Sequence, residues 1–158
     1  MILYQDNFLN QSEINHLLGL WDNDKPVHPI MKYNLTFYYL NFMTNDLDLT
    51  PIKDGIFERR KFYKMRLQKY NESINQTEYF HGHMTTHNYI IYLNEEFKGG
   101  ELEFEQGLLV KPKTGSLVYF NNNEKHRVKN CIGDRYIFTA LGDTKLDIKY
   151  KIHKKSIL

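Results

Sequence analysis

Apolar residues follow a helical spacing in one part of this chain, near its start. The positions that share one helical face are Ile14, Leu17, Leu18 and Trp21. Three or four residues separate neighbours on one side of a helix, so this spacing predicts a helix with one apolar face. We place it from Ser12 to Trp21, with Ser12 as the N-cap.

From Lys61 onward the apolar residues come in short runs bounded by turn residues. The runs that we predict as strands are 62–70, 89–93, 101–104, 108–110, 116–120 and 136–141. Gly99 with Gly100, and the stretch 112–115, supply turns between them. Aromatic residues make up 15% of the chain, and their rings suit pleated, half-buried surfaces. Many short strands without intervening helices indicate an antiparallel sandwich or barrel.

Three segments show a weaker pattern. The chain is aromatic and irregular after Pro26 and Pro29, and 45–54 is predicted as a surface loop around Pro51. The tail, 145–155, alternates lysines with apolar residues, which fits an edge strand with one wet face. A phosphate-binding patch is the alternative for these lysines, and the solvated edge is favoured.

Length and composition narrow the class of protein. The 158 residues suit a single domain, with an N-terminal helical part at about 1–25 and a β core at about 61–142. A net charge of +2 gives no clear signal for nucleic acid. Cys131 is the one cysteine, and the N-terminus lacks the pattern of a secretory signal, so we expect a cytoplasmic protein. No apolar run reaches the roughly 20 residues of a membrane helix, so no membrane partner is expected.

Two histidines, His81 and His83, lie two residues apart, which places both side chains on one face of an extended strand. A third, His126, stands at the start of a predicted turn and can join them across a sheet. Three neutral imidazoles suit iron, zinc or copper, and spacing alone does not choose among these metals. The alternative is that the pair lies on the surface without a metal.

Several pieces of the chain, in order, resemble one enzyme family. They are His81, the run 92–94 (Tyr-Leu-Asn), the double-glycine segment 97–104, the stretch 112–120 before His126, and 133–136 (Gly-Asp-Arg-Tyr). Together, the residues from Tyr70 to Leu141 resemble the catalytic core of the Fe(II)/2-oxoglutarate dioxygenases, in their prolyl 4-hydroxylase-like branch.

The resemblance implies a mainly β fold, a double-stranded β-helix of the jelly-roll or cupin-like kind, with the N-terminal helix packed on it. It implies Fe(II), 2-oxoglutarate and O2 as cofactors, with ascorbate as a further reductant, and oxidative decarboxylation coupled to substrate hydroxylation. His81 and His126 match iron ligands, and Arg135 matches the residue that pairs with the far carboxylate of 2-oxoglutarate. Tyr92 and Tyr70 match tyrosines of that pocket, although packing in the core explains Tyr70 better and explains Tyr92 equally well.

The sequence departs from the family at His83, where an aspartate normally completes the iron site. Three outcomes are open: His83 binds the metal, it turns away from the metal, or the domain has lost iron and acts only as a non-catalytic binding module. A neutral imidazole in place of a carboxylate leaves the site one unit more positive, which favours an anionic co-substrate. His87 and Glu78 are poorly placed on a regular strand to substitute as ligands.

Two other functions compete with the oxygenase. A three-histidine, cupin-type metal enzyme can begin with the same His-Gly-His run, but it leaves Arg135 unexplained. A non-catalytic binding module could keep the barrel after losing the aspartate. The substrate, a small molecule or a peptide, has no signature in the loop from Thr44 to Arg60.

Overall fold

The structure, a computed structural model, describes residues 1–22, 28–32, 35–41, 48–70, 79–148 and 151–152. Its helices are α1 (Gln11–Gly19) and the short 3-10 helices η1 (Leu20–Asp22), η2 (Lys53–Gly55) and η3 (Arg59–Lys61). Its strands are β1 (Ile2–Gln5), β2 (His28–Lys32), β3 (Leu35–Asn41), β4 (Lys64–Tyr70), β5 (His87–Tyr92), β6 (Lys98–Gly99), β7 (Leu102–Phe104), β8 (Leu109–Val110), β9 (Leu117–Asn121), β10 (His126–Val128), β11 (Cys131–Ile132), β12 (Arg135–Gly142) and β13 (Lys151–Ile152).

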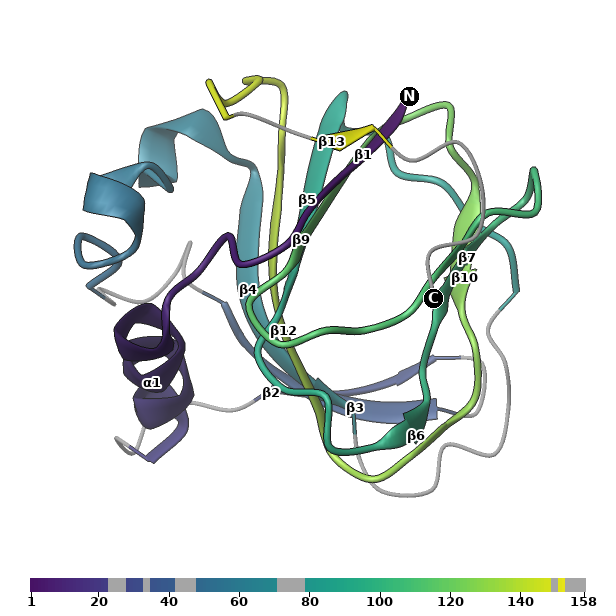
Figure 1. Cartoon of the computed structure of the whole chain (residues 1–158), viewed down its shortest axis with the longest axis horizontal. Helices are drawn as coiled ribbons and strands as arrows, with labels where there is room; N and C mark the ends of the chain where they lie inside the picture. The colour runs from purple at the N-terminus through teal and green to yellow at the C-terminus, as the bar shows by residue number, and fades with distance from the viewer. Residues whose placement is uncertain (23–27, 33–34, 42–47, 71–78, 149–150, 153–158) are drawn as a thin grey trace.

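The strands form one large sheet and two small ones. The large sheet has the order β13-β1-β9-β5-β12-β4-β3-β2, and the small sheets have the orders β10-β7-β8 and β11-β6. Within the described residues, the strand pairings in these sheets are all antiparallel. Figure 1 shows β7 and β10 facing β5 and β12 across the barrel, with α1 outside it. The fold is a double-stranded β-helix with an external helix, so this prediction is confirmed.

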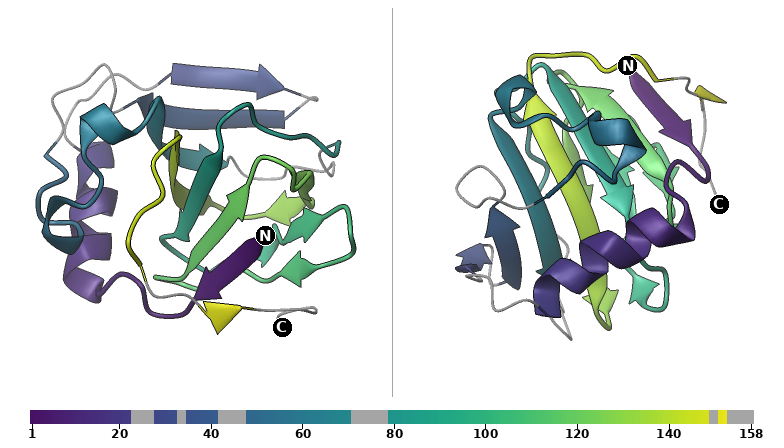
Figure 2. Two further views of the ribbon diagram at one scale, coloured as in Figure 1. Left: turned by 90° about the horizontal axis from the view of Figure 1, so that it is seen from above. Right: turned by 90° about the vertical axis from the view of Figure 1, so that its left-hand side faces the viewer.

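Helix α1 begins at Gln11, one residue before the predicted start at Ser12. Asn10, not Ser12, is the N-cap: its side chain accepts a hydrogen bond from the Glu13 N–H, and Glu13 bonds back to the Asn10 N–H. This reciprocal pair satisfies two N–H groups that the helix itself leaves without acceptors. The helix crosses the outer face of the large sheet (Figure 2), so the predicted packing of helix on barrel is confirmed.

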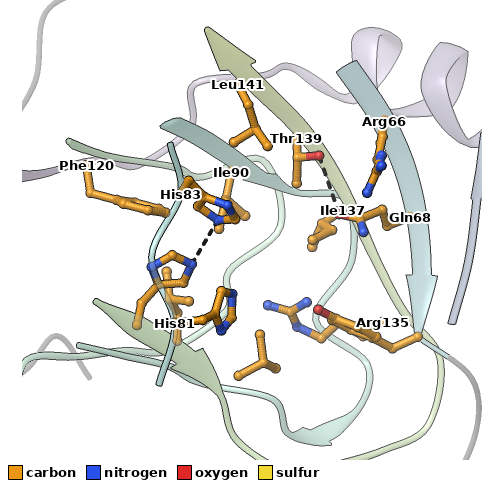
Figure 3. A pocket seen from close by; sticks show the side chains of 14 residues that line it. Arg66, Gln68, His81, His83, Ile90, Phe120, Arg135, Ile137, Thr139 and Leu141 are labelled. Atoms are coloured by element: carbon orange, nitrogen blue, oxygen red, sulfur yellow. Dashed lines mark hydrogen bonds between the residues drawn. The ribbon is translucent and has the colours of Figure 1, made fainter. Parts of the chain in front are cut away.

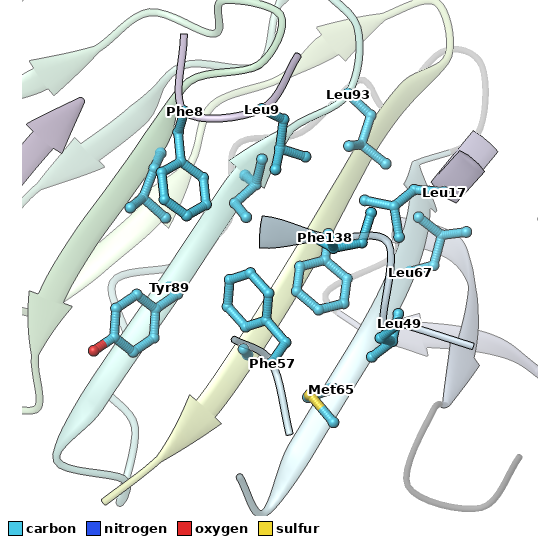
Figure 4. Close-up of a cluster of buried hydrophobic side chains, with 14 of the residues drawn as sticks. Phe8, Leu9, Leu17, Leu49, Phe57, Met65, Leu67, Tyr89, Leu93 and Phe138 are labelled. Atoms are coloured by element: carbon cyan, nitrogen blue, oxygen red, sulfur yellow. The ribbon is translucent and has the colours of Figure 1, made fainter. Parts of the chain in front are cut away.

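An apolar core lies between α1 and the outer face of the large sheet (Figure 4). Its buried members include Phe8, Leu9, Leu17, Leu49, Ile52, Phe57, Met65, Leu67, Tyr89, Ile91, Leu93 and Phe138. Three of them, Leu49, Ile52 and Phe57, come from the segment between 48 and 63. The prediction of a surface loop at 45–54 is therefore wrong for Leu49 and Ile52, which close over the sheet, while 45–47 lies outside the described residues.

A second apolar cluster fills much of the barrel interior. It contains Ile2, Tyr4, Tyr70, Ile90, Tyr92, Leu102, Phe104, Leu108, Val110, Val118, Phe120, Val128 and Ile137. Neighbouring residues of one strand fall in different clusters: Ile137 points inward and Phe138 outward on β12. This alternation follows from the two-residue period of a strand. The two faces of the large sheet therefore contribute to two separate apolar clusters.

The sequence pattern missed some elements. Strand β1 precedes the helix and pairs with β9, and β2 pairs with β3 in the region that looked irregular. In the tail, β13 pairs with β1 at the edge of the sheet, as predicted, but Leu146 is buried in the core rather than on that strand. Within the described residues, no helix has the length and apolar character needed to cross a bilayer.

Candidate active site

Three histidines meet inside the barrel. His81 and His126 lie opposite each other in an antiparallel bridge, and each backbone N–H donates to the other's carbonyl oxygen at 2.9 Å. His126 belongs to strand β10. The prediction that it stands at the start of a turn is therefore wrong. His83 completes the group, in which one ring nitrogen from each residue lies within 4.8 Å of the others. The structure therefore brings these three side chains together, while their role as metal ligands stays a prediction.

Hydrogen bonds to the backbone orient two of the rings. The Nδ1 atom of His81 lies 3.1 Å from the Tyr79 carbonyl oxygen, and that of His126 lies 3.0 Å from the Glu124 carbonyl oxygen. Since a carbonyl only accepts, Nδ1 carries the proton in both, and Nε2 keeps its lone pair. The Nε2 atoms of His83 and His126 are 3.1 Å apart. Two nitrogens bound at right angles to one ion, each at about 2.1 Å, would lie about 3 Å apart.

Burial keeps His126 neutral. Removal from water lowers the pKa of His126 to about 3, and the nearby His81 and His83 rings act in the same direction, against the hydrogen bond to Glu124. A metal ligand must offer a deprotonated nitrogen. The structure therefore holds this imidazole in the form that binds a cation.

Arg135 is fully buried on β12 and faces the same space. None of its three guanidinium nitrogens has a hydrogen-bond acceptor among the described residues. The guanidinium carbon lies 4.8 Å from the Tyr70 ring centre and 5.2 Å from that of Tyr92. These rings offset part of the cost of burying the charge. They accept no hydrogen bond in its plane, so the fork of donors is left for an anion.

The Tyr92 hydroxyl is a further buried polar group without a hydrogen-bond partner among the described residues. Burial raises the pKa of Tyr92, and the positive charge of Arg135 acts against that rise. The phenol therefore stays protonated and has a hydrogen to donate. Its ring packs against the guanidinium of Arg135, whose carbon lies 5.2 Å from the ring centre.

The double-glycine turn leaves room for Arg135. Gly100 has a φ of 72°, and a Cβ atom there would lie 3.1 Å from the Cδ of Arg135 and 3.3 Å from the Sγ of Cys131. A larger residue would be strained in this backbone conformation and would crowd the arginine stem. The glycine thus lets the loop close over the buried guanidinium.

One cavity of about 130 Å³ connects these groups. Its wall consists of Arg66, Gln68, Tyr70, His81, His83, Ile90, Leu102, Phe120, His126, Val128, Arg135, Ile137, Thr139 and Leu141. In Figure 3 the histidines line one side, and Arg135 points toward them from the lower right. A cavity with a cation-binding group on one side and an unpaired guanidinium on the other suits a small molecule with an anionic end.

The other predicted site residues lie at different places relative to the cavity and the histidine group. Tyr70 lines the cavity, whereas Tyr92 reaches Arg135 from the core behind it. His87 is not part of the histidine group, because its Nδ1 pairs with the Tyr119 hydroxyl at 2.7 Å. Glu78 lies outside the described residues.

Three polar residues of the cavity were not predicted: Arg66, Gln68 and Thr139. They could have been found from strand periodicity. Arg66 and Gln68 precede Tyr70 by four and two residues on the predicted strand 62–70, and residues at even spacing share a face. Thr139 follows Arg135 by four residues in the same way.

Comparison by sequence gives one family. The family model described as the 2OG-Fe(II) oxygenase superfamily matches residues 63–141, which is half of the chain. The match includes the three histidines and Arg135. No curated protein matches the chain in sequence.

Comparison by structure gives several oxygenases of the same fold. An oxidoreductase of the 2OG-Fe(II) oxygenase family from Burkholderia pseudomallei matches with a TM-score of 0.69 at 13% identity, covering 91% of this chain and 88% of that one. A Pseudomonas putida prolyl-4-hydroxylase matches with a TM-score of 0.66 at 14% identity, covering 91% and 93%. A Trichoplax adhaerens prolyl hydroxylase, solved with a hypoxia inducible factor peptide, matches with a TM-score of 0.66 at 15% identity, covering 90% and 83%. At these identities, the likeness shows the fold.

Proposed function

Because this chain belongs to the 2OG-Fe(II) oxygenase superfamily, whose cofactors are Fe(II), 2-oxoglutarate and O2, we propose that it is a hydroxylase of the prolyl 4-hydroxylase-like branch. In this proposal His81, His83 and His126 hold the iron, and Arg135 holds the far carboxylate of 2-oxoglutarate. Tyr70 and Tyr92 complete the co-substrate pocket. Prolyl hydroxylases among the structural neighbours support this choice of branch.

The donor set fits iron. Imidazole is a suitable ligand for Fe(II), and one nitrogen from each of the three rings lies within 4.8 Å of the others. Backbone hydrogen bonds fix the orientation of the His81 and His126 rings, and the three nitrogens would move closer together around a bound ion.

The single observation that carries the proposal is the buried guanidinium of Arg135. Each buried donor left without an acceptor costs about 1–3 kcal/mol, and a charged donor costs more. A fold keeps such a group when a ligand supplies the missing acceptors. The far carboxylate of 2-oxoglutarate would do so with two parallel hydrogen bonds, while the other end of the molecule faces the histidines.

His83 changes the charge of the site. With three neutral ligands the bound ion keeps its full charge of +2, whereas an aspartate would cancel one unit. The attraction for the dianionic co-substrate is then stronger in a site screened from water. We propose that His83 is a ligand, since its Nε2 faces that of His126 in this structure.

When bound, the iron supplies the oxidising chemistry that couples decarboxylation of 2-oxoglutarate to hydroxylation of a C–H bond. The chain's own residues would bind the iron and the co-substrate and orient them. Arg135 sets the position of the co-substrate by hydrogen bonds at its far end, and Tyr92 packs its ring behind the guanidinium. Ile90, Phe120 and Ile137 form apolar walls that exclude water from the space between.

The free thiol of Cys131 supports a reducing location. We therefore propose that the protein acts in the cytoplasm, on a small molecule or a peptide rather than on nucleic acid or a membrane.

The test is an assay of the purified protein with Fe(II), ascorbate and 2-oxoglutarate under air. We expect succinate to form, and we expect the iron complex to show a weak visible band. Bound iron without either signal would contradict the proposal and favour the cupin-type enzyme. Failure to bind any metal would favour the binding module.

A matched pair of arginine variants tests the role of Arg135. Arg135→Ala should weaken 2-oxoglutarate binding at least about 100-fold, because two charge-assisted hydrogen bonds are lost, and should leave the iron affinity nearly unchanged. The control is Arg127→Ala, since Arg127 pairs with Glu103 at 2.7 Å outside the cavity. Equal losses of iron and 2-oxoglutarate binding in Arg135→Ala would contradict the assigned role.

A third variant tests His83. If His83 is a ligand, His83→Asp restores the usual carboxylate and should keep iron and retain or increase succinate formation. Complete loss of metal from this variant would show that the position is not a ligand. Metal content can be measured by atomic absorption on the purified protein.

A further inference from the structure

We infer that the open end of the cavity holds a second anion subsite, formed by Arg66 and Gln68, which binds a carboxylate of the primary substrate. This inference rests on the proposed function, since it takes Arg135 as the partner of 2-oxoglutarate. It names the substrate class as a small molecule or peptide that carries a carboxylate close to the C–H bond to be hydroxylated.

The register of the sheet separates the two arginines. Tyr70 on β4 lies opposite Arg135 on β12, and Arg66 lies opposite Thr139. Four residues of strand span about 13 Å, so Arg66 and Arg135 enter the cavity at different levels. Arg66 and Arg135 therefore start from well separated positions along the paired strands β4 and β12. Figure 3 shows Arg66 and Thr139 in the upper part of the site and Arg135 in the lower part.

Burial distinguishes an open end from a closed end. Arg135 and Tyr70 are buried, whereas Arg66 and Leu141 are only partly buried although they line the same cavity. His81 and His83 are also partly buried and lie on the other side of the cavity from these arginines (Figure 3). Arg66 is therefore at the more exposed end of the cavity, and Arg135 is at the buried end.

Gln68 provides a second donor beside Arg66. Its amide oxygen accepts a hydrogen bond from the Thr139 hydroxyl at 3.4 Å, and its NH2 group is then left as a donor. Gln68 and Thr139 are both buried, with 9% and 8% of their surface exposed, so their orientation is fixed by packing. A guanidinium with an adjacent amide N–H is a suitable cradle for a carboxylate.

The charge of the cavity favours an anion there. No aspartate or glutamate is among the described residues that line it, whereas two arginines are. Fe(II) and the 2-oxoglutarate dianion cancel each other when the three protein ligands are neutral. The two lining arginines then add two positive charges, and a carboxylate on the primary substrate would offset one of them.

The test uses protein loaded with Mn(II) and 2-oxoglutarate, so that no turnover occurs. The probes are N-acetyl-leucine and N-acetyl-proline, each compared with its amide, which differs only in lacking the charge. Isothermal titration calorimetry should show about 10- to 100-fold tighter binding of each acid than of its amide. Arg66→Gln should abolish this preference, and Arg66→Lys should keep part of it.

Further measurements keep the outcome clear. Arg66→Gln should change the affinity for 2-oxoglutarate by less than about threefold, against at least about 100-fold for Arg135→Ala. If Arg66→Gln does not fold, Gln68→Leu serves instead and should reduce the preference for the acids about three- to tenfold. Equal binding of acids and amides to the unsubstituted protein would overturn the inference. A large loss of 2-oxoglutarate binding in Arg66→Gln would also overturn it and assign Arg66 to the co-substrate.

The two proposals fail separately. If the unsubstituted protein binds Mn(II) but not 2-oxoglutarate, the proposed function is contradicted. The comparison of acids with amides can then be made on the Mn(II) protein alone, where loss of the preference in Arg66→Gln still supports the anion subsite.

Discussion

The two faces of the large sheet use the same strands for different purposes. On the outer face of β12, Phe138 and Ala140 are fully buried against apolar neighbours under α1. On its inner face, Arg135 and Thr139 bring polar groups into the barrel. The outer face resembles an ordinary protein core, while the inner face carries a charge with no acceptor in the described part of the chain. Apolar clusters thus stabilise both faces of the sheet, and the polar groups available for binding lie on the inner one.

The first prediction concerns the outer face. Phe138 is fully buried and packs edge-on against Phe57, with ring centres 5.0 Å apart. Phe138→Ala should lower the free energy of unfolding by about 3–5 kcal/mol, because it removes a large buried ring and leaves a cavity. Urea unfolding measures this, and a loss below about 1 kcal/mol would show that the outer face is not the main core.

The second prediction concerns the histidine group on the inner face. His126→Ala should weaken iron binding at least about 100-fold, more than the loss from removing a group that merely orients a ligand. His87→Gln is the control, since His87 pairs with Tyr119 outside the group and should leave iron binding within about threefold of its original value. Equal effects of the two variants, measured by competition with a chelator, would contradict this division.

The third prediction concerns Arg135, where a substitution should stabilise the protein, whereas Phe138→Ala should destabilise it. Arg135→Met should raise the free energy of unfolding of the ligand-free protein by about 1–3 kcal/mol, because a buried charge without acceptors is replaced by an apolar chain of similar length. The same variant should no longer be stabilised by 2-oxoglutarate. Destabilisation of the ligand-free protein would mean that Arg135 has a structural partner and that the two faces are less different than described.

The smallest expected effect is at the start of α1. Asn10→Ala should cost about 1 kcal/mol of stability, since it removes the capping side chain, and Ser12→Ala should cost less than about 0.5 kcal/mol. Neither variant should alter iron binding, because α1 packs on the outer face. Thermal unfolding at equal protein concentration separates the two, and a larger effect at Ser12 would restore the original assignment of the cap.

Short apolar runs bounded by turn residues predicted the β core, because both signals are local properties of the chain. Strand periodicity placed His81 and His83 together, and the resemblance to a family added His126 and Arg135. The local sequence pattern did not predict strands whose pairing partners are distant in the sequence. Strand β1, for example, owes its position to β9, more than a hundred residues further on.

The candidate site was only partly predictable for a related reason. Arg66 and Gln68 have no motif that marks them, and their role depends on the register that brings β4 beside β12. The cap at Asn10 was missed because Ser12 is an equally good capping residue and the choice depends on where the chain leaves β1. The burial of Leu49 and Ile52 depends on contacts with the sheet that turn-forming neighbours do not reveal.

The central claim is that one small dianion bridges the histidine-bound metal and Arg135. The most direct test is the affinity of 2-oxoglutarate for the protein with and without Fe(II), measured without oxygen. Because the two ligands would touch, we predict that iron tightens 2-oxoglutarate binding at least about tenfold, with the same gain for iron when 2-oxoglutarate is present. Equal affinity in the presence and absence of iron would contradict the account.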